Sequence, residues 1–488
     1  MSPVDDFFRS RIDQMIDLRT PLAVLASRMP WQEIEASLAH QFARQVKAGK
    51  KVEDIGLFGP EVKLVGGGRS NAGRPRLPIR LMVSLLYLKH AFNESDEAVV
   101  ERWAETPTWQ YFSGMDYFEH RLPCDATLVG KFRKLIGEEG VEELLSQTIA
   151  AALSMKLIDK KALETVVVDT TVQPKAIAHP TDSRLLEVAR EKLVEVAKEV
   201  GITLKQTFAK EGKQLTRKAS GYAHARQFRR LRKPINRQRT IVSRLARAIE
   251  RQMAALADEL KQRVAEALSK AQRIVSQTKQ RKSDGTPKLY SWPAPEVEVI
   301  AKGKAHKPYE FGVKVGLAST LKQNLILGAR SFPNNPYDGH TLAEQLEQVS
   351  ILSNATIKDV YVDLGYRGVD HQNPGVNIKH RGKYKSLSDT ERRLLKRRQA
   401  IEPIIGHLKS DHRMNRCHLR GSNGDAIHAV LCAAGYNIRW LLRMILKKGV
   451  RLYFYLIRLL GLGGLFARKT PANRLDGPTS GRLSLLST

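Results

Sequence analysis

The chain has 488 residues, and its 81 Lys and Arg against 50 Asp and Glu give a net charge of +31 at pH 7. At about 100–200 residues per domain this length corresponds to about two to four structural units, which excludes a peptide too short to bury a core. The large excess of positive charge indicates a polyanionic partner, either nucleic acid or an anionic membrane surface.

The distribution of apolar residues favours nucleic acid over a membrane. The most apolar stretch, Val450–Phe466, is interrupted by Arg451, Arg458 and Gly461 and falls short of the roughly 18 uninterrupted apolar residues of a membrane span. The N-terminus lacks the basic region, apolar core and cleavage site of an export signal. The three cysteines are scattered, which argues against a disulfide framework. We therefore expect a cytoplasmic protein without membrane contact.

The N-terminal third is predicted to be helical. Residues 1–60 indicate short amphipathic helices around Leu25, Ile34 and Phe42, and the Gly-rich, basic stretch 66–76 indicates a loop, so residues 1–75 are expected to form a helical and linker segment. From Pro78 to about Leu157 apolar residues recur every three or four positions. This spacing predicts a second helical unit over residues 76–160.

A buried strand and a strongly basic block come next. β-branched residues crowd into Thr165–Val172, as a buried strand requires. Residues 184–288 contain 27 Lys and Arg and only 10 Asp and Glu, a net charge of +17. Apolar residues step by three or four from Val242 to Leu268, which predicts one long amphipathic helix.

Strand signals return after Pro295. Strands are predicted at residues 309–317, 324–329, 359–363 and 375–378, and helices at 341–352 and about 392–409. Because the first strand precedes the basic block and the other four follow it, we expect an α/β core with a mixed five-stranded sheet, residues 161–183 plus 289–447. The basic block, residues 184–288, is then a helical insertion in this core, and residues 448–488 are a C-terminal tail.

Two aspartates of the expected core are candidates for metal ligands. Asp169 and Asp363 each lie at or near the C-terminal end of a short apolar strand, where a side chain can project from a rigid sheet edge. An Asp that ends a strand can equally be a turn residue that bonds to nearby backbone. Both interpretations apply to each aspartate taken alone.

A third carboxylate, Glu402, stands between two cations. Arg398, Glu402 and Lys409 are at positions i, i+4 and i+11, which on a helix fall within about 40° of one another. A carboxylate between two cations suits a site that holds both a metal and a phosphate, and the alternative is an ordinary salt-bridged face. Pro403 removes a helical hydrogen bond, so a break or helix start is expected near Glu402.

Three such carboxylates suit phosphodiester cleavage. Two metal ions about 3.5–4 Å apart activate a water or a 3′-hydroxyl and stabilise the leaving oxygen, and carboxylates hold both ions. Oxygen ligands and retained waters favour Mg²⁺, which Mn²⁺ can replace.

Four segments carry a resemblance to a known family. They are residues 166–172 (VVVDTTV), 335–341 (NPYDGHT), 360–368 (VYVDLGYRG) and 397–409 (RRQAIEPIIGHLK). The chain resembles the DDE transposases of bacterial insertion sequences, specifically the branch named after insertion sequences four and five. The last segment is the most specific, because it is similar to the family signature of Arg, three residues, Glu, six residues and Lys. Residues 75–134 also resemble the N-terminal domain of this branch, so the resemblance covers most of residues 75–435.

The resemblance implies a fold, a site and an activity. It implies an RNase H-like core, a DNA-binding role for residues 76–160, and divalent-metal ligands at Asp169, Asp363 and Glu402. Arg398 and Lys409 match the positions of candidate DNA-phosphate contacts. The implied reaction is metal-dependent cleavage and strand transfer at the element's terminal inverted repeats. The implied partners are double-stranded DNA, of the element ends and the target, and a second copy of the chain in a nucleoid-associated homodimer.

One position departs from the family pattern. Related members have a Tyr three residues before the signature Arg, whereas this chain has Leu395. The interval of 194 positions between Asp169 and Asp363 is long, and the basic insertion explains it.

Other polar groups allow further interpretations. His407, His412, Cys417 and His418 could be zinc ligands, but their spacing lacks the paired pattern of structural zinc sites. His340 beside Asp338 either shapes a catalytic pocket or belongs to a structural turn that starts at Asn334.

The insertion contains a basic run, a segment rich in basic residues and without acidic ones. Its cations are Arg226, Arg229, Arg230, Arg232, Lys233, Arg237 and Arg239. No acidic residue lies within the run, which favours binding of the DNA backbone over a merely solvated helix face. Such contacts are salt-sensitive and independent of sequence.

Three functions remain as hypotheses. The first is an enzyme that cuts and rejoins the DNA ends of its own element. The second is a catalytically inactive, transposase-derived DNA-binding protein or repressor, against which the presence of all three acids speaks. The third is a resolvase-like or repair nuclease that cleaves without joining.

Overall fold

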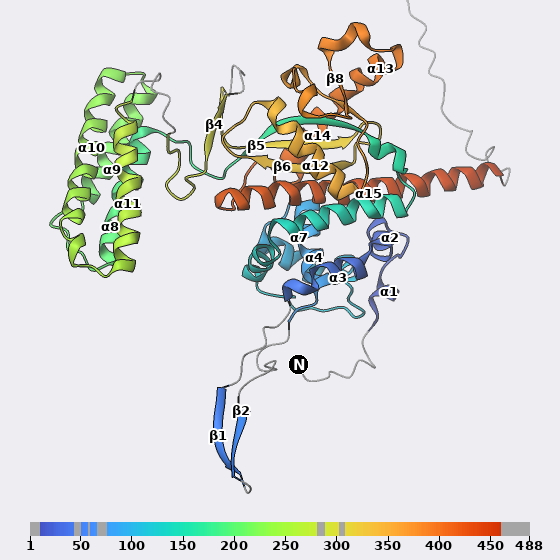
Figure 1. Ribbon diagram of the computed structural model, residues 1–488, viewed down its shortest axis with the longest axis horizontal. Helices are drawn as coiled ribbons and strands as arrows, with labels where there is room; N and C mark the ends of the chain where they lie inside the picture. The colour runs from blue at the N-terminus through green and yellow to red at the C-terminus, as the bar shows by residue number, and fades with distance from the viewer. Residues whose placement is uncertain are drawn as a thin grey trace, which may run out of the picture.

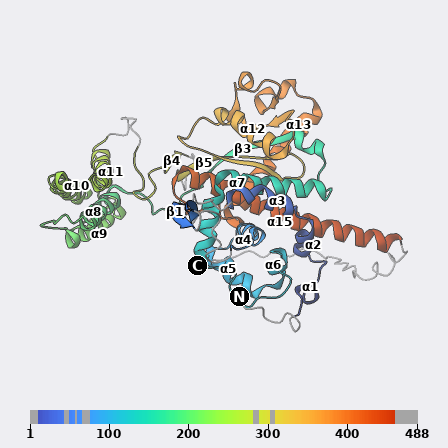
Figure 2. The same cartoon turned by 60° about the horizontal axis from the view of Figure 1, so that its bottom comes forward.

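The structure is a computed structural model that describes residues 10–42, 50–56, 59–65, 76–280, 288–301 and 308–459. One large hydrophobic core joins the N-terminal helices, a mixed sheet and the last helix. A second hydrophobic core, from Leu185 to Trp292, consists of the insertion and the few residues that follow it. Figures 1 and 2 show the insertion set apart on one side of the sheet.

The sheet has six strands and is mixed. They are β3 (Thr165–Pro174), β4 (Glu298–Ala301), β5 (Tyr309–Thr320), β6 (Ile326–Phe332), β7 (Asp359–Tyr361) and β8 (Asn377–Lys379). The order is β4–β5–β3–β7–β8, and β6 also pairs with β5. β3 pairs antiparallel with β5 and parallel with β7, and β7 pairs parallel with β8.

The expected mixed α/β core is present, but the expected strand count of five is wrong. The predicted strands correspond to β3, β5, β6, β7 and β8. The sixth, β4, pairs with residues 309–312 of β5, next to the part of β5 that pairs with β6. Only four residues long, β4 gives too short a pattern to be recognised from sequence.

Among the described residues, the N-terminal part contains eight helical segments. They are α1 (Ile12–Met15), α2 (Pro21–Arg28), α3 (Trp31–Ala39), η2 (His40–Phe42), α4 (Ile79–Ala91), α5 (Asp96–Glu105), α6 (Pro107–Phe112) and α7 (Ala126–Ser154). The helices expected around Leu25 and Ile34 are α2 and α3, and their apolar residues enter the main core. A short η3 (Lys160–Glu164) leads from α7 into β3.

A hairpin between residues 50 and 65 differs from the helical expectation for this segment. β1 (Lys50–Gly56) and β2 (Gly59–Val65) pair antiparallel, from Lys50 opposite Val65 to Gly56 opposite Gly59. The hairpin projects away from the body (Figure 1). Glycines at both ends of the turn favour a hairpin, whereas the apolar residues of β1 do not alternate and give no clear strand pattern. Residues 66–75 of the expected Gly-rich loop lie outside the described residues.

The last helix, α15 (Gly421–Leu459), lies between the sheet and the N-terminal helices (Figure 1). Asn437 is fully buried, and its side chain bonds the backbone of Ile326 in β6 and the hydroxyl of Thr148 in α7. Residues 421–449 are long and apolar enough to cross a membrane, yet 67% of the most apolar window is buried inside the protein, as in a core helix. α15 continues past residue 447, where the C-terminal tail was expected to begin.

The insertion is a four-helix bundle of α8 (Asp182–Glu199), α9 (Ala209–His224), α10 (Phe228–Glu250) and α11 (Asp258–Gln277). The single long helix expected from Val242 to Leu268 is wrong. The chain turns through η4 (Met253–Ala255) and restarts at Asp258, and acidic residues favour a helix start at that point. Apolar spacing alone cannot distinguish one helix from two that share a core.

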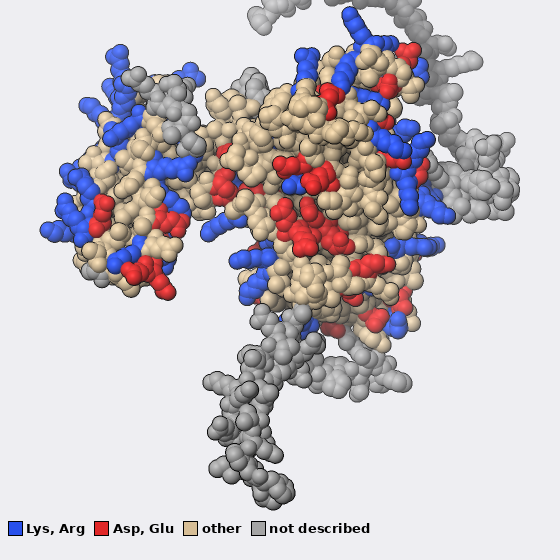
Figure 3. All heavy atoms as spheres, viewed as in Figure 1, with Lys and Arg blue, Asp and Glu red and all other residues tan. Residues whose placement is uncertain are grey.

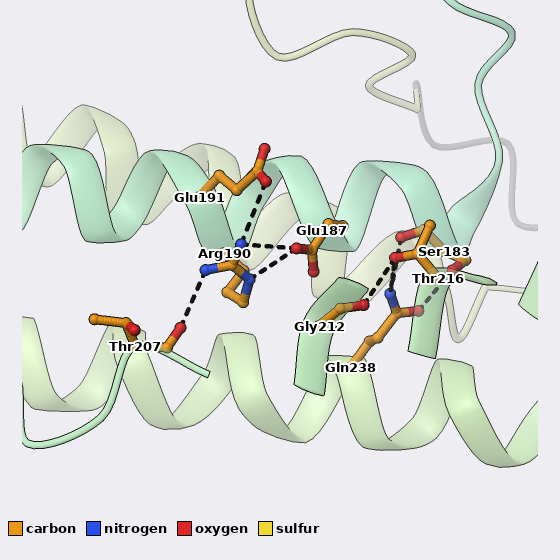
Figure 4. Close-up of polar contacts among 8 residues, drawn as sticks. All are labelled: Ser183, Glu187, Arg190, Glu191, Thr207, Gly212, Thr216 and Gln238. Carbon is orange, nitrogen blue, oxygen red and sulfur yellow. Dashed lines mark hydrogen bonds and ion pairs between the residues drawn. The ribbon is translucent and has the colours of Figure 1, made fainter. Parts of the chain in front are cut away.

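Buried polar contacts hold the bundle helices in register. Arg190 of α8 forms an ion pair with Glu187 at 2.7 Å and donates to the carbonyl of Thr207. Gln238 of α10 bonds both Ser183 of α8 and Thr216 of α9 (Figure 4). Since buried polar groups are costly when unpaired, these contacts favour one arrangement of the helices.

The remaining helical elements lie between β6 and α15 in the chain. They are η5 (Asp338–Thr341), α12 (Leu342–Ser353), η6 (Leu364–Tyr366), η7 (Asp370–Gln372), η8 (Arg381–Ser386), α13 (Asp389–Arg397), η9 (Arg398–Ala400) and α14 (Ile401–Asp411). The break expected near Glu402 is confirmed. The chain passes from α13 through η9 into α14, and Pro403 falls in the first turn of α14, where its missing N–H breaks no helical hydrogen bond.

Candidate active site

The register of two parallel strands brings Asp169 and Asp363 together. Thr165 lies opposite Asp359 and Val167 opposite Tyr361, so Asp169 and Asp363 are each two residues beyond the last pair. Asp169 lies within β3 rather than at its end, which differs from the expectation. It is nonetheless next to the end of β7, because β7 stops at Tyr361. Both carboxylates therefore belong to one edge of the sheet.

Asp169 is a buried carboxylate beside like charges. Its Oδ1 accepts a hydrogen bond from the Thr170 backbone N–H at 2.8 Å, and its side chain is 18% exposed. Burial raises the pKa of Asp169 to about 6, against the opposing effect of Arg398 and with a further upward contribution from Asp363 and Asp338. An accumulated negative charge of this kind attracts a cation.

Asp363 caps the short helix that follows β7. Its Oδ1 accepts from the Gly365 backbone N–H at 2.8 Å, which fixes the direction of the carboxylate. A Cβ at Gly365 would lie 2.9 Å from Asp363 Oδ1 and 3.2 Å from Asp338 Oδ2. The absence of a side chain at this position therefore lets two carboxylates approach each other.

Asp338 enters the same pocket from η5. Its Oδ1 accepts from the Thr170 hydroxyl at 3.0 Å and pairs with Lys314 Nζ of β5 at 2.8 Å. His340, its expected companion, stacks edge-on against Tyr337 at 5.5 Å. Tyr366 is fully buried, and its pKa is raised by burial and by the charges of Asp169, Asp338 and Asp363.

Of the three residues of the expected signature, only Arg398 makes a described contact with the aspartates. Arg398 Nη1 donates to Asp169 Oδ2 at 3.4 Å, and both side chains are largely buried. Glu402 lies in the first turn of α14, one helical turn beyond Arg398, with an exposed side chain. Lys409 lies 3.8 Å from Glu310 of β5. Arg398 and Lys409 therefore each lie near an acidic residue of a sheet strand, Asp169 and Glu310 respectively.

The oxygen donors fit a hard divalent cation such as Mg²⁺. Such an ion would offset the burial and, in addition, the like charges that raise the pKa of Asp169. Among the described residues, no group of three or more His, Cys, Asp or Glu side chains is close enough to hold a metal ion as it stands. In this arrangement the guanidinium of Arg398 is the cation in contact with Asp169.

Leu395, where the family has Tyr, is a core residue. It is buried in a small hydrophobic cluster with Val167, Tyr361 and Ile401, among others. A side chain at this position points away from solvent, so its apolar character is explained by packing.

The possible zinc ligands are held by separate partners. His407 Nδ1 lies 2.7 Å from Asp411, His412 Nδ1 bonds the carbonyl of His90, and the Cys417 thiol donates to the carbonyl of Leu419. Burial lowers the pKa of His412 to about 4 and raises the pKa of Cys417 to about 12. His412 and Cys417 thus have structural contacts in the core, whereas His407 pairs with Asp411 at the surface.

The basic run lies at the turn from α9 to α10. Arg226, Arg229, Arg230, Arg232 and Lys233 are all exposed, and none has an acidic partner among the described residues. Arg237 is different, because Glu211 of α9 pairs with it at 2.6 Å. Figure 3 shows Lys and Arg side chains over the outer side and upper end of the insertion, and acidic groups between α12 and α7.

The sequence reasoning missed three members of the pocket. Lys314, Thr170 and Tyr366 were not considered, and Asp338 was noted without a role. A signal for Asp338 and Tyr366 was present, because both stand in the segments NPYDGHT and VYVDLGYRG, which carry the family resemblance. Nothing in the alternating pattern of β5 distinguishes Lys314 from an ordinary outward-facing strand residue.

Comparisons with known proteins agree with this arrangement. The family model "Transposase domain (DUF772)" matches residues 10–135, and the model "Transposase DDE domain" matches residues 275–438. The second range includes Asp363 and Glu402, and Asp169 lies between the two ranges. A Rhizobium meliloti protein described as "Uncharacterized protein ORF8 in nfe locus" is 43% identical over 224 residues, which are 46% of this chain and 95% of that protein. No solved structure matches the chain.

The DDE domain implies an RNase H-like fold, and the mixed sheet with β3 between an antiparallel and a parallel neighbour is consistent with it. A transposase domain matches the N-terminal part and another matches the part that carries Asp363. These two domain matches therefore support a transposase of the kind found in insertion sequences.

Proposed function

We propose that this protein cuts and rejoins the ends of an insertion sequence of the branch named after insertion sequences four and five. The observation that carries the proposal is the β3–β7 register, which places Asp169 beside Asp363 in a chain with two transposase domains. Hydrolysis at the terminal inverted repeats and strand transfer into target DNA are the proposed steps.

The proposed metal ligands are Asp169, Asp363 and Glu402. A bound Mg²⁺, or Mn²⁺ in its place, supplies charge stabilisation and a nucleophilic oxygen for phosphodiester chemistry. Asp169 and Asp363 are held by backbone N–H groups, so their carboxylates are oriented before any ligand binds. Glu402 would be supplied by the first turn of α14, where the helix dipole favours a carboxylate.

Arg398 and Lys409 are the proposed contacts to DNA phosphate. Arg398 donates to Asp169 in this structure and would have to exchange that contact to reach a phosphate. Arg226, Arg229, Arg230, Arg232 and Lys233 are proposed to bind the DNA backbone outside the catalytic pocket, since they are exposed and without described acidic partners.

The wider organisation is part of the proposal. We assign sequence-specific DNA binding to residues 76–160 and catalysis to residues 161–183 plus 289–447. A homodimer is proposed because two element ends must be brought together. Such a protein acts in the cytoplasm, associated with the nucleoid.

The test is an in vitro assay on DNA that carries the terminal inverted repeats, with Mg²⁺ or Mn²⁺. Cleavage at the repeat ends and joined products in target DNA are expected, and both should disappear with EDTA. An inactive DNA-binding derivative would shift the mobility of the DNA and never nick it, and a nuclease would cleave without joining. Either of these results contradicts the proposal.

A further inference from the structure

Asp338 presents one free carboxylate oxygen to the pocket. Its Oδ1 is held by the Thr170 hydroxyl at 3.0 Å and by Lys314 Nζ at 2.8 Å. No hydrogen bond to its Oδ2 is found among the described residues. A Cβ built on Gly365 would lie 3.2 Å from Asp338 Oδ2 and 2.9 Å from Asp363 Oδ1, so both oxygens face the same small space. The two oxygens therefore converge over Gly365.

The backbone around Asp338 is fixed in this position. The Thr341 hydroxyl donates to the Asp338 carbonyl at 2.7 Å, and Lys314 Nζ also donates to the Pro336 carbonyl at 2.6 Å. Because Lys314 is bound to the backbone of the turn as well, it holds the turn as a whole and leaves Asp338 Oδ2 without a partner. The carboxylate is directed toward Asp363 before any ligand is present.

A buried hydroxyl gives an independent indication of a ligand. The Tyr366 O–H is fully buried and has no hydrogen bond of normal geometry among the described residues. It lies near Asp169, Asp338 and Asp363, with the Thr341 hydroxyl beside it. Buried polar groups normally have partners, so an unpaired hydroxyl among three carboxylates indicates space for a bound cation or its water.

We propose that Asp338 is a further carboxylate ligand of the divalent-metal centre, beside Asp169 and Asp363. The inference rests on the proposed function and adds a residue that the three-acid signature does not contain. Lys314 offsets one negative charge of the pocket, which allows three aspartates to remain close together in the metal-free protein. Arg398, paired with Asp169, offsets a second one.

The test measures Mn²⁺ binding to the full-length protein by electron paramagnetic resonance, independently of activity. Asp338→Asn keeps the shape of the side chain and removes its charge, and it should weaken Mn²⁺ binding about tenfold or more, the scale of effects around metal ligands. Asp338→Glu keeps the charge and should retain binding within a few fold of wild type. Glu344→Gln is the matched control, because Glu344 is also an ion-paired acid, with Arg330, at the start of α12 but outside the pocket.

The outcomes separate the inference from the proposed function. Weakened binding in Asp338→Asn, with Glu344→Gln like wild type, supports the inference. Wild-type affinity in Asp338→Asn while Asp169→Asn loses Mn²⁺ would overturn the role of Asp338 and leave the proposed centre intact. Wild-type affinity in Asp169→Asn and Asp363→Asn would overturn both. Unfolding of each variant, measured in EDTA, identifies a folding defect. If folded Asp338→Glu lost Mn²⁺ binding as strongly as Asp338→Asn, a ligand role that depends on the charge of Asp338 would be contradicted.

Discussion

Asp169 shows how the site favours a ligand at the expense of stability. Its carboxylate is buried, its nearest acidic neighbours repel it, and Arg398 compensates only in part, so its pKa rises to about 6 from an ordinary 3.8. A surface optimised only for folding would not gather these charges. Strain of this kind is common where a protein is prepared to bind a partner that the free chain lacks.

The raised pKa of Asp169 leads to a pH-dependent prediction. Because the folded-state value is above the unfolded one, the folded protein keeps this proton at pH values where the unfolded chain has lost it. The destabilising effect is therefore absent below about pH 4, grows up to about pH 6 and is complete above it. Without metal, Asp169→Asn should raise the free energy of unfolding at pH 8 by up to about 3 kcal/mol and should have little effect at pH 4.

Urea denaturation in EDTA at pH 4, 6 and 8 measures this effect. The exposed Asp389, which pairs with Arg392 at 3.0 Å, offers Asp389→Asn as a control that should change little at any of these pH values. A destabilised Asp169→Asn variant at pH 8 would contradict this account of the pocket.

Sequence reasoning identified the two strand aspartates because their physical signal is local. A short run of β-branched residues that ends in Asp can be recognised from a few residues of sequence. In the structure, the strands that contain these two runs, β3 and β7, pair in parallel. The distance of Glu402 from this pair could not be predicted, since it depends on the turn η9 between two helices. Leu395 is explained only by its packing, and two of its neighbours, Val167 and Tyr361, come from distant parts of the chain.

At the scale of elements, the turn between α9 and α10 concentrates unpaired positive charge. We expect replacement of Arg229, Arg232 and Lys233 by Gln to weaken DNA binding at all sequences and to lower the salt dependence of log Kd by about one per lost contact. Fluorescence anisotropy on specific and random duplexes at several salt concentrations measures both effects.

A matched control uses three cations of the same bundle that already have acidic partners. They are Lys192, Lys261 and Arg263, paired with Glu195, Asp258 and Glu199. Their triple replacement by Gln should have a smaller effect on affinity. Equal losses in the two triple variants would mean that overall charge, and not the α9–α10 turn, binds the DNA.

The register of the insertion helices depends on a glycine in α9. A Cβ at Gly212 would lie 2.7 Å from Arg190 Nε, within the buried pair that Arg190 forms with Glu187 (Figure 4). Gly212→Ala should therefore destabilise the protein by about 1–3 kcal/mol, the usual range for disturbed buried polar groups. Gly221, in the same helix, has nothing within 4 Å, so Gly221→Ala should be neutral or gain up to about 1 kcal/mol from helix propensity. Thermal unfolding compares the two, and equal destabilisation would refute the packing argument.

The sequence predicted element types better than element ends. The stripe from Val242 to Leu268 continues across the turn at η4 because α10 and α11 bury their apolar faces in the same core. The β1–β2 hairpin has no counterpart in the helical expectation, since a two-stranded element that packs on little else leaves only a weak pattern.

At the scale of the whole molecule, α15 connects the parts that the sequence separates. It packs on α4 and α7 of the N-terminal part and on β6 of the sheet, so the two parts share one hydrophobic core. The insertion keeps a core of its own (Figures 1 and 2). Local patterns could indicate the insertion by its charge, but the shared core depends on contacts between distant segments that no local pattern records.

The most direct measurement of the central claim compares three single variants on terminal-repeat DNA with Mg²⁺ or Mn²⁺. Asp169→Ala, Asp363→Ala and Glu402→Ala should each abolish cleavage and strand transfer, while a mobility-shift assay shows DNA binding like that of wild type. Full activity in any one of the three would contradict the assignment of these acids to one metal-dependent site.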